Sequence, residues 1–278
     1  MLHLPIAKNF HRGQGVDGHF LKFPLVLVKF FTMATYYIYQ KDGFEEGIPF
    51  AVDAGEMHHL LRVLRATHSD DLYAFDGQGT VGHGVLRMET NRRCIFIPQN
   101  VQRTDPPPPL QLLQGIVKHG AMEQIIRQGT QLGMTHLYPL CGQYSVVQFP
   151  NNFLQRHNRW RTIAIEACKQ SKNPFLPSIE DPMELEKVLP TLPRDAIKIV
   201  LSLRSGSIPL KHWANNRNMC FPKAISIAIG PEGDFSPKEY EVLQQWEFEE
   251  VSLGSKILTS ETAAVAILGI FSALSTAP

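Results

Sequence analysis

The sequence lacks features that mark several classes of protein. It contains only four cysteines, which lie far apart and form no Cys-x-x-Cys pair. A zinc knuckle and a dense disulfide framework are therefore not indicated, and free thiols in a reducing cytosol are expected. The 27 Lys and Arg residues nearly balance 26 Asp and Glu residues, leaving a net charge of +1. Any contact with nucleic acid must therefore come from a local patch.

A long uninterrupted apolar segment is also missing. Residues 20–39 are largely apolar, but Lys22, Pro24 and Lys29 interrupt them, which argues against a transmembrane helix. A signal peptide with residues 25–31 as its apolar core is one alternative. We favour another, in which residues 1–32 are an extension and folding begins near Met33. We therefore expect a cytoplasmic protein that does not cross a membrane.

The remaining composition is that of a globular protein with two domains. The 278 residues are 44% hydrophobic and 19% charged, which excludes wholesale disorder. Four consecutive prolines fall within residues 104–109, and such a run forms a stiff spacer that no helix or strand crosses. We expect this segment to link a domain of residues 33–103 to one of residues 110–278.

The two domains show different patterns. In the first, short apolar runs at residues 36–39, 72–75, 84–88 and 94–97, with a helical piece at 56–64, predict a small barrel. In the second, strands alternate with helices, which predicts an α/β domain with a parallel sheet. The expected strands are 110–117, 135–140, 197–203 and 224–229. Helices are expected at 121–132 and 153–171, and after capping sequences at Asp181 and Ser236. A final helix from residue 260 is apolar nearly all round, so it packs in the core or against a second subunit.

Two motif matches fail on their context. Residues 77–82 fit Gly-x-Gly-x-x-Gly, but a strand follows and Asp76-Gly77 is a hairpin signal, so a turn is predicted instead of a cofactor loop. Four histidines match no metal-ligand spacing, and no metal site is expected; they are His58, His59, His68 and His83.

The most informative pattern is near the C-terminus. A buried strand runs into the sequence GPEGDF at residues 230–235, and a capped helix follows. Residues 251–263 repeat the order of strand, glycine loop and helix. Loops at the carboxyl edge of an open α/β sheet bind ligands, whereas tight turns use the same residues, and spacing alone leaves both alternatives open.

GPEGDF followed by LGSKILTSETA resembles the paired signature of the RsmE family, bacterial 16S rRNA (uracil-N3) methyltransferases of the SPOUT superfamily. Residues 59–65 with 75–77 resemble the family's N-terminal PUA-like barrel. Lys118, Glu123 and the Arg159-Trp160 pair match its helical regions. The resemblance covers most of the chain after Met33, where the family usually begins.

The resemblance implies a fold, a cofactor and partners. The fold is α/β, a C-terminal trefoil-knotted SPOUT domain preceded by a small PUA-like β-barrel. The partners are 16S rRNA in the 30S subunit and a second copy of the chain. The cofactor, S-adenosylmethionine, is expected against three loops, at Leu201, Ser202, Leu203, Ile229, Gly230, Pro231, Glu232, Gly233, Leu253, Gly254, Ile257 and Leu258.

In the reaction that this resemblance implies, the uracil N3 proton must leave: either a general base takes it, or positive charge stabilises the developing anion. Glu261, Glu232 and Lys256 are the candidate catalytic residues. An alternative for Glu261 is an acidic first-turn residue that the helix dipole favours. The general base and the nucleotide methylated stay open.

The chain departs from the family where arginine is usual, at Tyr144, Asn173 and Thr259, and Asp234 replaces a usual glycine. A possible basic surface remains at Lys256, Arg159, Arg161, Lys169 and Lys172, and its alternative is the solvated face of a helix. These departures keep two other functions open: a non-catalytic RNA-binding descendant, and a SPOUT methyltransferase with another RNA target.

Overall fold

The computed structural model describes residues 36–58, 60, 72–90, 93–144, 153–215 and 224–275. The expected extension, residues 1–32, lies outside this part of the chain. So do His59, His68, Cys220 and most of the helix expected at residues 56–64, of which residues 56–58 lie within α1 (Ala54–His58).

The first sheet is mixed, with the strand order β1-β3-β4-β5-β2. Its first pair, β1 with β3, is parallel and the other pairs are antiparallel. Buried Ile38, Leu72, Ala74 and Phe96 form its core. The strands are β1 (Tyr36–Tyr39), β2 (Phe50–Ala51), β3 (Leu72–Phe75), β4 (Thr80–Thr90) and β5 (Arg93–Arg103).

The turn predicted at Asp76-Gly77 is confirmed. Strands β3 and β4 pair antiparallel on either side of it, and Asp76 Oδ1 accepts hydrogen bonds from the N–H groups of Gln78 (2.7 Å) and Thr80 (3.0 Å). Gly77 and Gly79 have φ of 78° and 100°, the left-handed region that glycine adopts without strain. The glycines of this motif therefore serve a hairpin.

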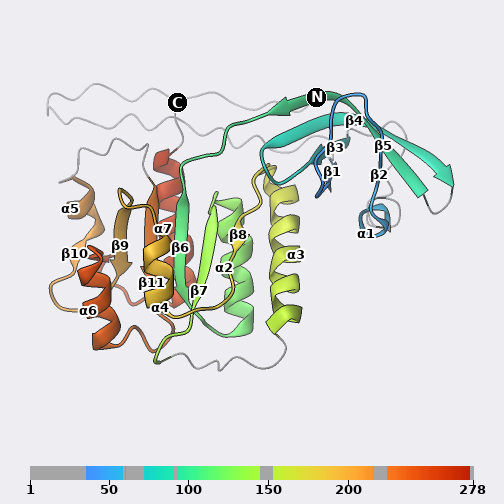
Figure 1. The fold of residues 1–278 in the computed structure, drawn as a ribbon. Coiled ribbons are helices and arrows are strands. Elements are labelled where there is room, and N and C mark those ends of the chain that lie inside the picture. Colours follow the sequence, from blue (N-terminus) through green and yellow to red (C-terminus); the bar gives the residue numbers. More distant parts are fainter. Residues whose placement is uncertain are drawn as a thin grey trace, which may run out of the picture. The chain divides into compact units, whose positions relative to one another are not determined.

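The second sheet is parallel, as predicted. Residues 104–109 carry neither helix nor strand and lead into it. Its order is β10-β12-β9-β11-β6-β7-β8, so β11, late in the chain, lies between β6 and β9. The strands are β6 (Leu110–Gly115), β7 (His136–Leu140), β8 (Ser178–Ile179), β9 (Ile197–Leu201), β10 (Ile208–Pro209), β11 (Ile225–Ile229) and β12 (Glu249–Ser252) (Figure 1).

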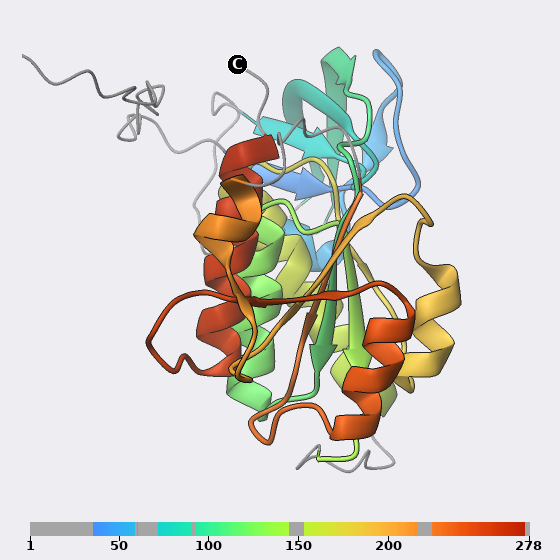
Figure 2. The same ribbon diagram turned by 90° about the vertical axis from the view of Figure 1, so that its left-hand side faces the viewer.

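Helices cover both faces of this sheet because its strands are apolar on both sides (Figure 2). Neighbouring residues such as Leu112 and Leu113 belong to different cores, as the two-residue period of a strand requires. One face carries α2 (His119–Gln131), α3 (Phe153–Ser171), α5 (Leu210–Asn215) and α7 (Ser260–Ser275). The other carries α4 (Leu185–Val188), the 3-10 helix Leu189–Thr191 and α6 (Pro237–Gln245).

The two predicted capping sequences have different outcomes. Ser236 forms the expected capping box with Glu239 at the start of α6. The helix expected after Asp181 instead begins at Leu185. Met183 is the reason, because its backbone pairs with the end of β7: its N–H donates to Pro139 O (3.1 Å) and its carbonyl accepts from Cys141 N (2.9 Å). Extended pairing of this kind excludes helical geometry at the same residue.

Helix α7 is apolar, as expected, and it is buried along one side. Ala264, Ile267, Leu268 and Phe271 are fully buried, whereas Ile270 is 38% exposed and Leu274 is 45% exposed. None of the helices described in the structure is both long and apolar enough to span a bilayer.

Candidate functional site

A pocket of about 320 Å³ lies at the carboxyl ends of three neighbouring strands, β12, β9 and β11. The loop after each strand contributes to it, together with the first turns of α7. The lining residues are Leu201, Ser202, Leu203, Ile229, Gly230, Pro231, Glu232, Asp234, Val251, Leu253, Lys256, Ile257, Leu258, Thr259, Ser260 and Ala263. This is the edge at which open α/β sheets bind ligands, and the volume suits a small molecule.

The turn after β11 is held tightly by its neighbours. All five residues of β11 are buried, so the strand end is fixed in the sheet. Gly230 follows, and its carbonyl accepts a 2.7 Å hydrogen bond from Ser260 Oγ at the start of α7. Ser260 Oγ in turn accepts from Gln114 Nε2 of β6 at 2.8 Å. Two strands and a helix N-terminus thereby share one hydrogen-bonded chain at the pocket wall.

Gly230 itself is required by its surroundings. A Cβ at this position would stand 2.9 Å from Asp234 Oδ1 and 3.0 Å from Phe235 N. Real Cβ atoms do not approach polar atoms so closely, and Asp234 is itself held in place. The glycine therefore lets the turn close over the strand end.

Three residues of the pocket lining have backbone N–H groups that the chain itself leaves available. Across the described ranges, no hydrogen bond engages the backbone N–H of Leu203, Glu232 or Leu258, one residue from each of the three loops. Unpaired N–H groups on loops at strand ends are suited to bind the acceptor atoms of a ligand.

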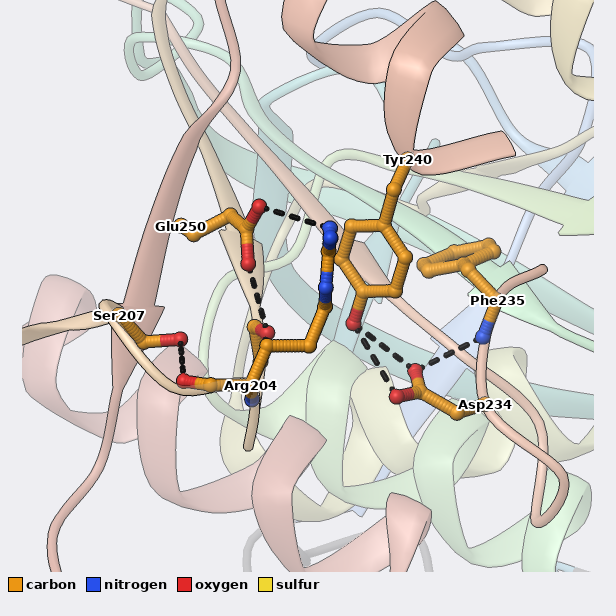
Figure 3. A network of polar contacts seen from close by, with 7 residues as sticks. Arg204, Ser207, Asp234, Phe235, Tyr240 and Glu250 are labelled. Carbon is orange, nitrogen blue, oxygen red and sulfur yellow. Dashed lines mark hydrogen bonds and ion pairs between the residues drawn. The ribbon is translucent and has the colours of Figure 1, made fainter. Parts of the chain in front are cut away.

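A polar network stands beside the pocket (Figure 3). Asp234 accepts hydrogen bonds from Tyr240 Oη, at 3.0 Å to Oδ1 and 3.2 Å to Oδ2. The Arg204 guanidinium lies 4.5 Å from the centroid of the Tyr240 ring and pairs with Glu250 at 3.0 Å. Burial raises the pKa of Tyr240 well above its usual value, so the phenol stays protonated as a donor.

The structure brings most of the predicted cofactor residues to one wall. Gly233 and Gly254 are the two that do not line the pocket. Gly233 instead lies against Tyr144, and Gly254 has φ of 136° in open space, so it serves the shape of its loop. Sequence reasoning did not assign five lining residues, Asp234, Val251, Thr259, Ser260 and Ala263. Ser260 and Ala263 could have been predicted from the sequence, because residues three apart at the start of a helix lie on the same side of it.

The three candidate catalytic residues are placed differently. Lys256 is exposed and lines the pocket. Glu232 also lines the pocket, and its Oε1 accepts a 3.3 Å hydrogen bond from Lys118 N. Glu261 is half-buried in the first turn of α7 and is not part of the lining. Its position fits the alternative of an acidic residue at a helix N-terminus.

Three residues of the expected basic surface lie on α3, where internal contacts occupy them. Lys169 has only 10% of its side chain exposed and pairs with Glu56 of α1 and with Glu166 (2.8 Å), so its assignment to a free basic surface was wrong. The reason is tertiary, because the partner Glu56 comes from a distant part of the chain. Arg159 pairs with Glu123, and Arg161 donates to Tyr39 Oη at 3.1 Å. Of the residues expected there, Lys256 belongs instead to the pocket.

Two of the positions where arginine was expected have local structural roles. Asn173 Nδ2 donates to Thr130 O (3.0 Å), and its Oδ1 accepts from Phe175 N (3.0 Å). Thr259 lines the pocket, and its hydroxyl lies 2.9 Å from that of Thr262. Tyr144 is 46% exposed beside Gly233.

Comparison with known proteins gives consistent results. The RNA methyltransferase domain family matches residues 104–272, more than half of the chain. A ribosomal RNA small subunit methyltransferase E from Synechocystis is 29% identical over 223 residues, which cover 79% of this chain and 71% of the relative. A protein of the same name from Aquifex aeolicus is 28% identical over 221 residues, covering 78% of this chain and 90% of the relative.

A solved structure shares the fold. The ribosomal RNA small subunit methyltransferase E from Neisseria gonorrhoeae, bound to S-adenosyl methionine, superposes with a TM-score of 0.76 at 23% identity. The match covers 87% of this chain and 98% of that protein. At this identity the likeness supports the arrangement of helices and strands described above.

Proposed function

Because the chain belongs to the RNA methyltransferase domain family, we propose that it methylates N3 of a uridine in 16S rRNA, with S-adenosylmethionine as the methyl donor. The names of its relatives agree with the resemblance predicted from GPEGDF and LGSKILTSETA, which is thereby confirmed. The observation that carries the proposal is the meeting of three strand-end loops around one pocket of about 320 Å³.

The lining fits this donor. Apolar side chains such as Leu203, Ile229 and Leu258 offer a surface for an adenine ring, and the free backbone donors offer hydrogen bonds to its polar atoms. The carboxylates of Glu232 and Asp234 suit a ligand that carries positive charge. We assign binding of the donor to the three loops, at residues 201–203, 229–234 and 253–260.

When bound, the donor supplies a methyl group on a sulfonium, whose S–CH₃ bond breaks with its electron pair left on sulfur while uracil N3 supplies the pair for the new bond. The chain must hold N3 in line with that methyl group and remove the N3 proton. Glu232 is the preferred proton acceptor over Glu261, because Glu232 lines the pocket. Lys256 offsets the charge that develops on the uracil.

The RNA must present an unpaired base. N3 lies on the Watson–Crick edge, so the target uridine reaches the pocket only when it is flipped out or single-stranded. We propose that the sheet of β1 to β5 belongs to a PUA-like barrel that helps to hold rRNA of the 30S subunit in the cytoplasm.

The finer fold and the assembly complete the proposal. The position of β11 between β6 and β9 supports a SPOUT domain with a trefoil knot. The exposed apolar residues Ile270 and Leu274 of α7 support a homodimer through this domain.

Two measurements test the function. Calorimetry should show binding of S-adenosylmethionine to the purified protein. The protein should then transfer a methyl group to 30S subunits from a strain that lacks the methyltransferase, and mapping of the modified nucleotide should identify N3 of a uridine. Binding of cofactor and RNA without transfer would instead support the non-catalytic descendant, and modification of another RNA would support a different target.

A further inference from the structure

We infer that Asp234 is a specificity-determining residue, whose carboxylate makes the pocket prefer the cationic sulfonium of the methyl donor to the neutral thioether of the product. The inference rests on the proposed function and deepens it. It concerns a residue that the chain places in the pocket wall by an uncommon backbone conformation.

The conformation of Asp234 is the first observation. Its φ is +64°, in the left-handed region that residues with a side chain seldom occupy, although Asp and Asn occur there more often than others. Hydrogen bonds compensate for the strain: Asp234 Oδ1 accepts from Phe235 N at 2.8 Å and from Tyr240 Oη at 3.0 Å. The carboxylate is therefore fixed beside the Gly230 turn.

The second observation is that the partner of Asp234 is itself fixed. The Arg204 guanidinium lies over the Tyr240 ring, and Glu250 holds that guanidinium (Figure 3). Ser202 Oγ donates to Glu250 Oε2 at 2.9 Å and accepts from Arg204 N at 3.1 Å. This network joins the loop after β9, strand β12, helix α6 and the turn after β11. Groups of the chain itself therefore hold the carboxylate of Asp234 in place.

The third observation concerns the charges around Asp234. Both donors to Asp234 are neutral, and the ion pairs among the described residues do not include it. The positive charge of Arg204 is paired with Glu250. The charged residues of the lining are Glu232, Asp234 and Lys256, so carboxylates outnumber cations there. A carboxylate in a partly enclosed pocket attracts a cation more strongly than it would in water.

The donor and its product differ in the charge that this carboxylate would sense. S-adenosylmethionine has a positive sulfur, and S-adenosylhomocysteine, which remains after the methyl group leaves, has a neutral one. The rest of the two molecules is the same. Asp234 therefore strengthens binding of the donor without strengthening binding of the product, which favours exchange of product for fresh donor after each turnover.

The experiment compares dissociation constants for the two ligands by calorimetry in the wild-type protein and in Asp234→Asn. The substitution removes the charge and keeps one oxygen, Oδ1, which can still accept from both Phe235 N and Tyr240 Oη. We expect the Kd for S-adenosylmethionine to rise by roughly tenfold, equivalent to about 1.4 kcal/mol. The Kd for S-adenosylhomocysteine should change by less than about twofold, well below that tenfold step. Glu232→Gln is the matched control, because it removes the charge of the other carboxylate in the lining. In this variant the ratio of the two dissociation constants should change less than in Asp234→Asn.

If Asp234 served only the shape of the turn, the two ligands would respond alike to the substitution. If Asp234→Asn weakens both ligands equally, or weakens neither, the inference is wrong. Tyr240→Phe is a second test, which remains available if Asp234→Asn fails to fold. It removes the hydroxyl that fixes the carboxylate but leaves the charge, so the preference for the donor should fall only partly. If the wild-type protein binds neither ligand, the proposed function itself fails, which is distinct from an unchanged ratio.

Discussion

The α-carbon of Gly115, at the end of β6, lies against the ring of Pro231: a Cβ on Gly115 would stand 2.5 Å from Pro231 Cδ. Both residues are tightly held, because β6 is buried throughout and Pro231 directly follows Gly230, whose carbonyl accepts from Ser260 Oγ. Gly115→Ala must therefore push the turn out of place. We expect it to weaken S-adenosylmethionine binding by at least about tenfold in calorimetry.

Gly120→Ala is the control for this substitution. Gly120 lies in α2, and beyond its chain neighbours and the backbone of its own helix no atom stands within 4 Å of a Cβ placed there. Alanine also favours helix over glycine, so this variant should keep or slightly raise its melting temperature and bind the donor as the wild type does. Equal binding by both variants would show that contact with the Pro231 turn does not matter for the site.

Lys169 should make a large contribution to stability. Its ammonium pairs with Glu56 and Glu166, and only 10% of its side chain is exposed. Lys169→Met would leave Glu56, itself only 13% exposed, without this cation, and breaking a buried ion pair costs about 3 kcal/mol or more. Chemical denaturation should show this loss.

Lys187→Met provides the comparison for an exposed pair. Lys187 pairs with Glu184 at 3.2 Å, with 68% and 65% of their side chains exposed. Such pairs contribute about 1 kcal/mol or less. Similar losses for both variants would contradict the burial-based argument for Lys169.

Lys256→Ala should reduce methyl transfer far more than cofactor binding. Lys256 is exposed on the pocket lining, where its charge can meet the RNA and the developing anion. We expect kcat on 30S subunits to fall by about a hundredfold, in the range that one stabilising group supplies, with a Kd for the donor within about threefold of wild type. Unchanged turnover would remove Lys256 from the mechanism.

Cys168 should give the protein an alkaline sensitivity. The thiol is 1% exposed, and burial raises its pKa from an ordinary value of 9.0 to about 12. The folded state therefore prefers the thiol, and this contribution is complete below pH 9 and is lost as pH rises toward 12. Across that window the free energy of unfolding should fall more steeply with pH for the wild type than for Cys168→Ala, and chemical denaturation at a series of pH values measures both slopes. Rapid alkylation of Cys168 by iodoacetamide at pH 8 in the folded protein would contradict the assignment.

Much of the fold was determined by local sequence. Helix α3 has its predicted bounds, Phe153–Ser171, because its apolar residues recur at helical spacing. Ser236 and Glu239 form their capping box because both partners lie within one turn. The glycines of GPEGDF and LGSKIL marked the loops that line the pocket, since both loops directly follow apolar strands.

Tertiary structure alone decided the features that depend on distant partners. Asp181-Pro182 carries a helix-start pattern, yet pairing of Met183 with Pro139 of β7 delays the helix to Leu185. The sequence predicts Lys169 to be a surface cation, yet its ammonium pairs with Glu56, which is more than a hundred residues away in the chain. Asp234 departs from a glycine motif in the sequence, and only the fold shows that Tyr240 donates to its carboxylate while Arg204 lies over the Tyr240 ring. Periodicity records the preferences of neighbouring residues, whereas these contacts depend on how strands far apart in the chain order themselves in the sheet.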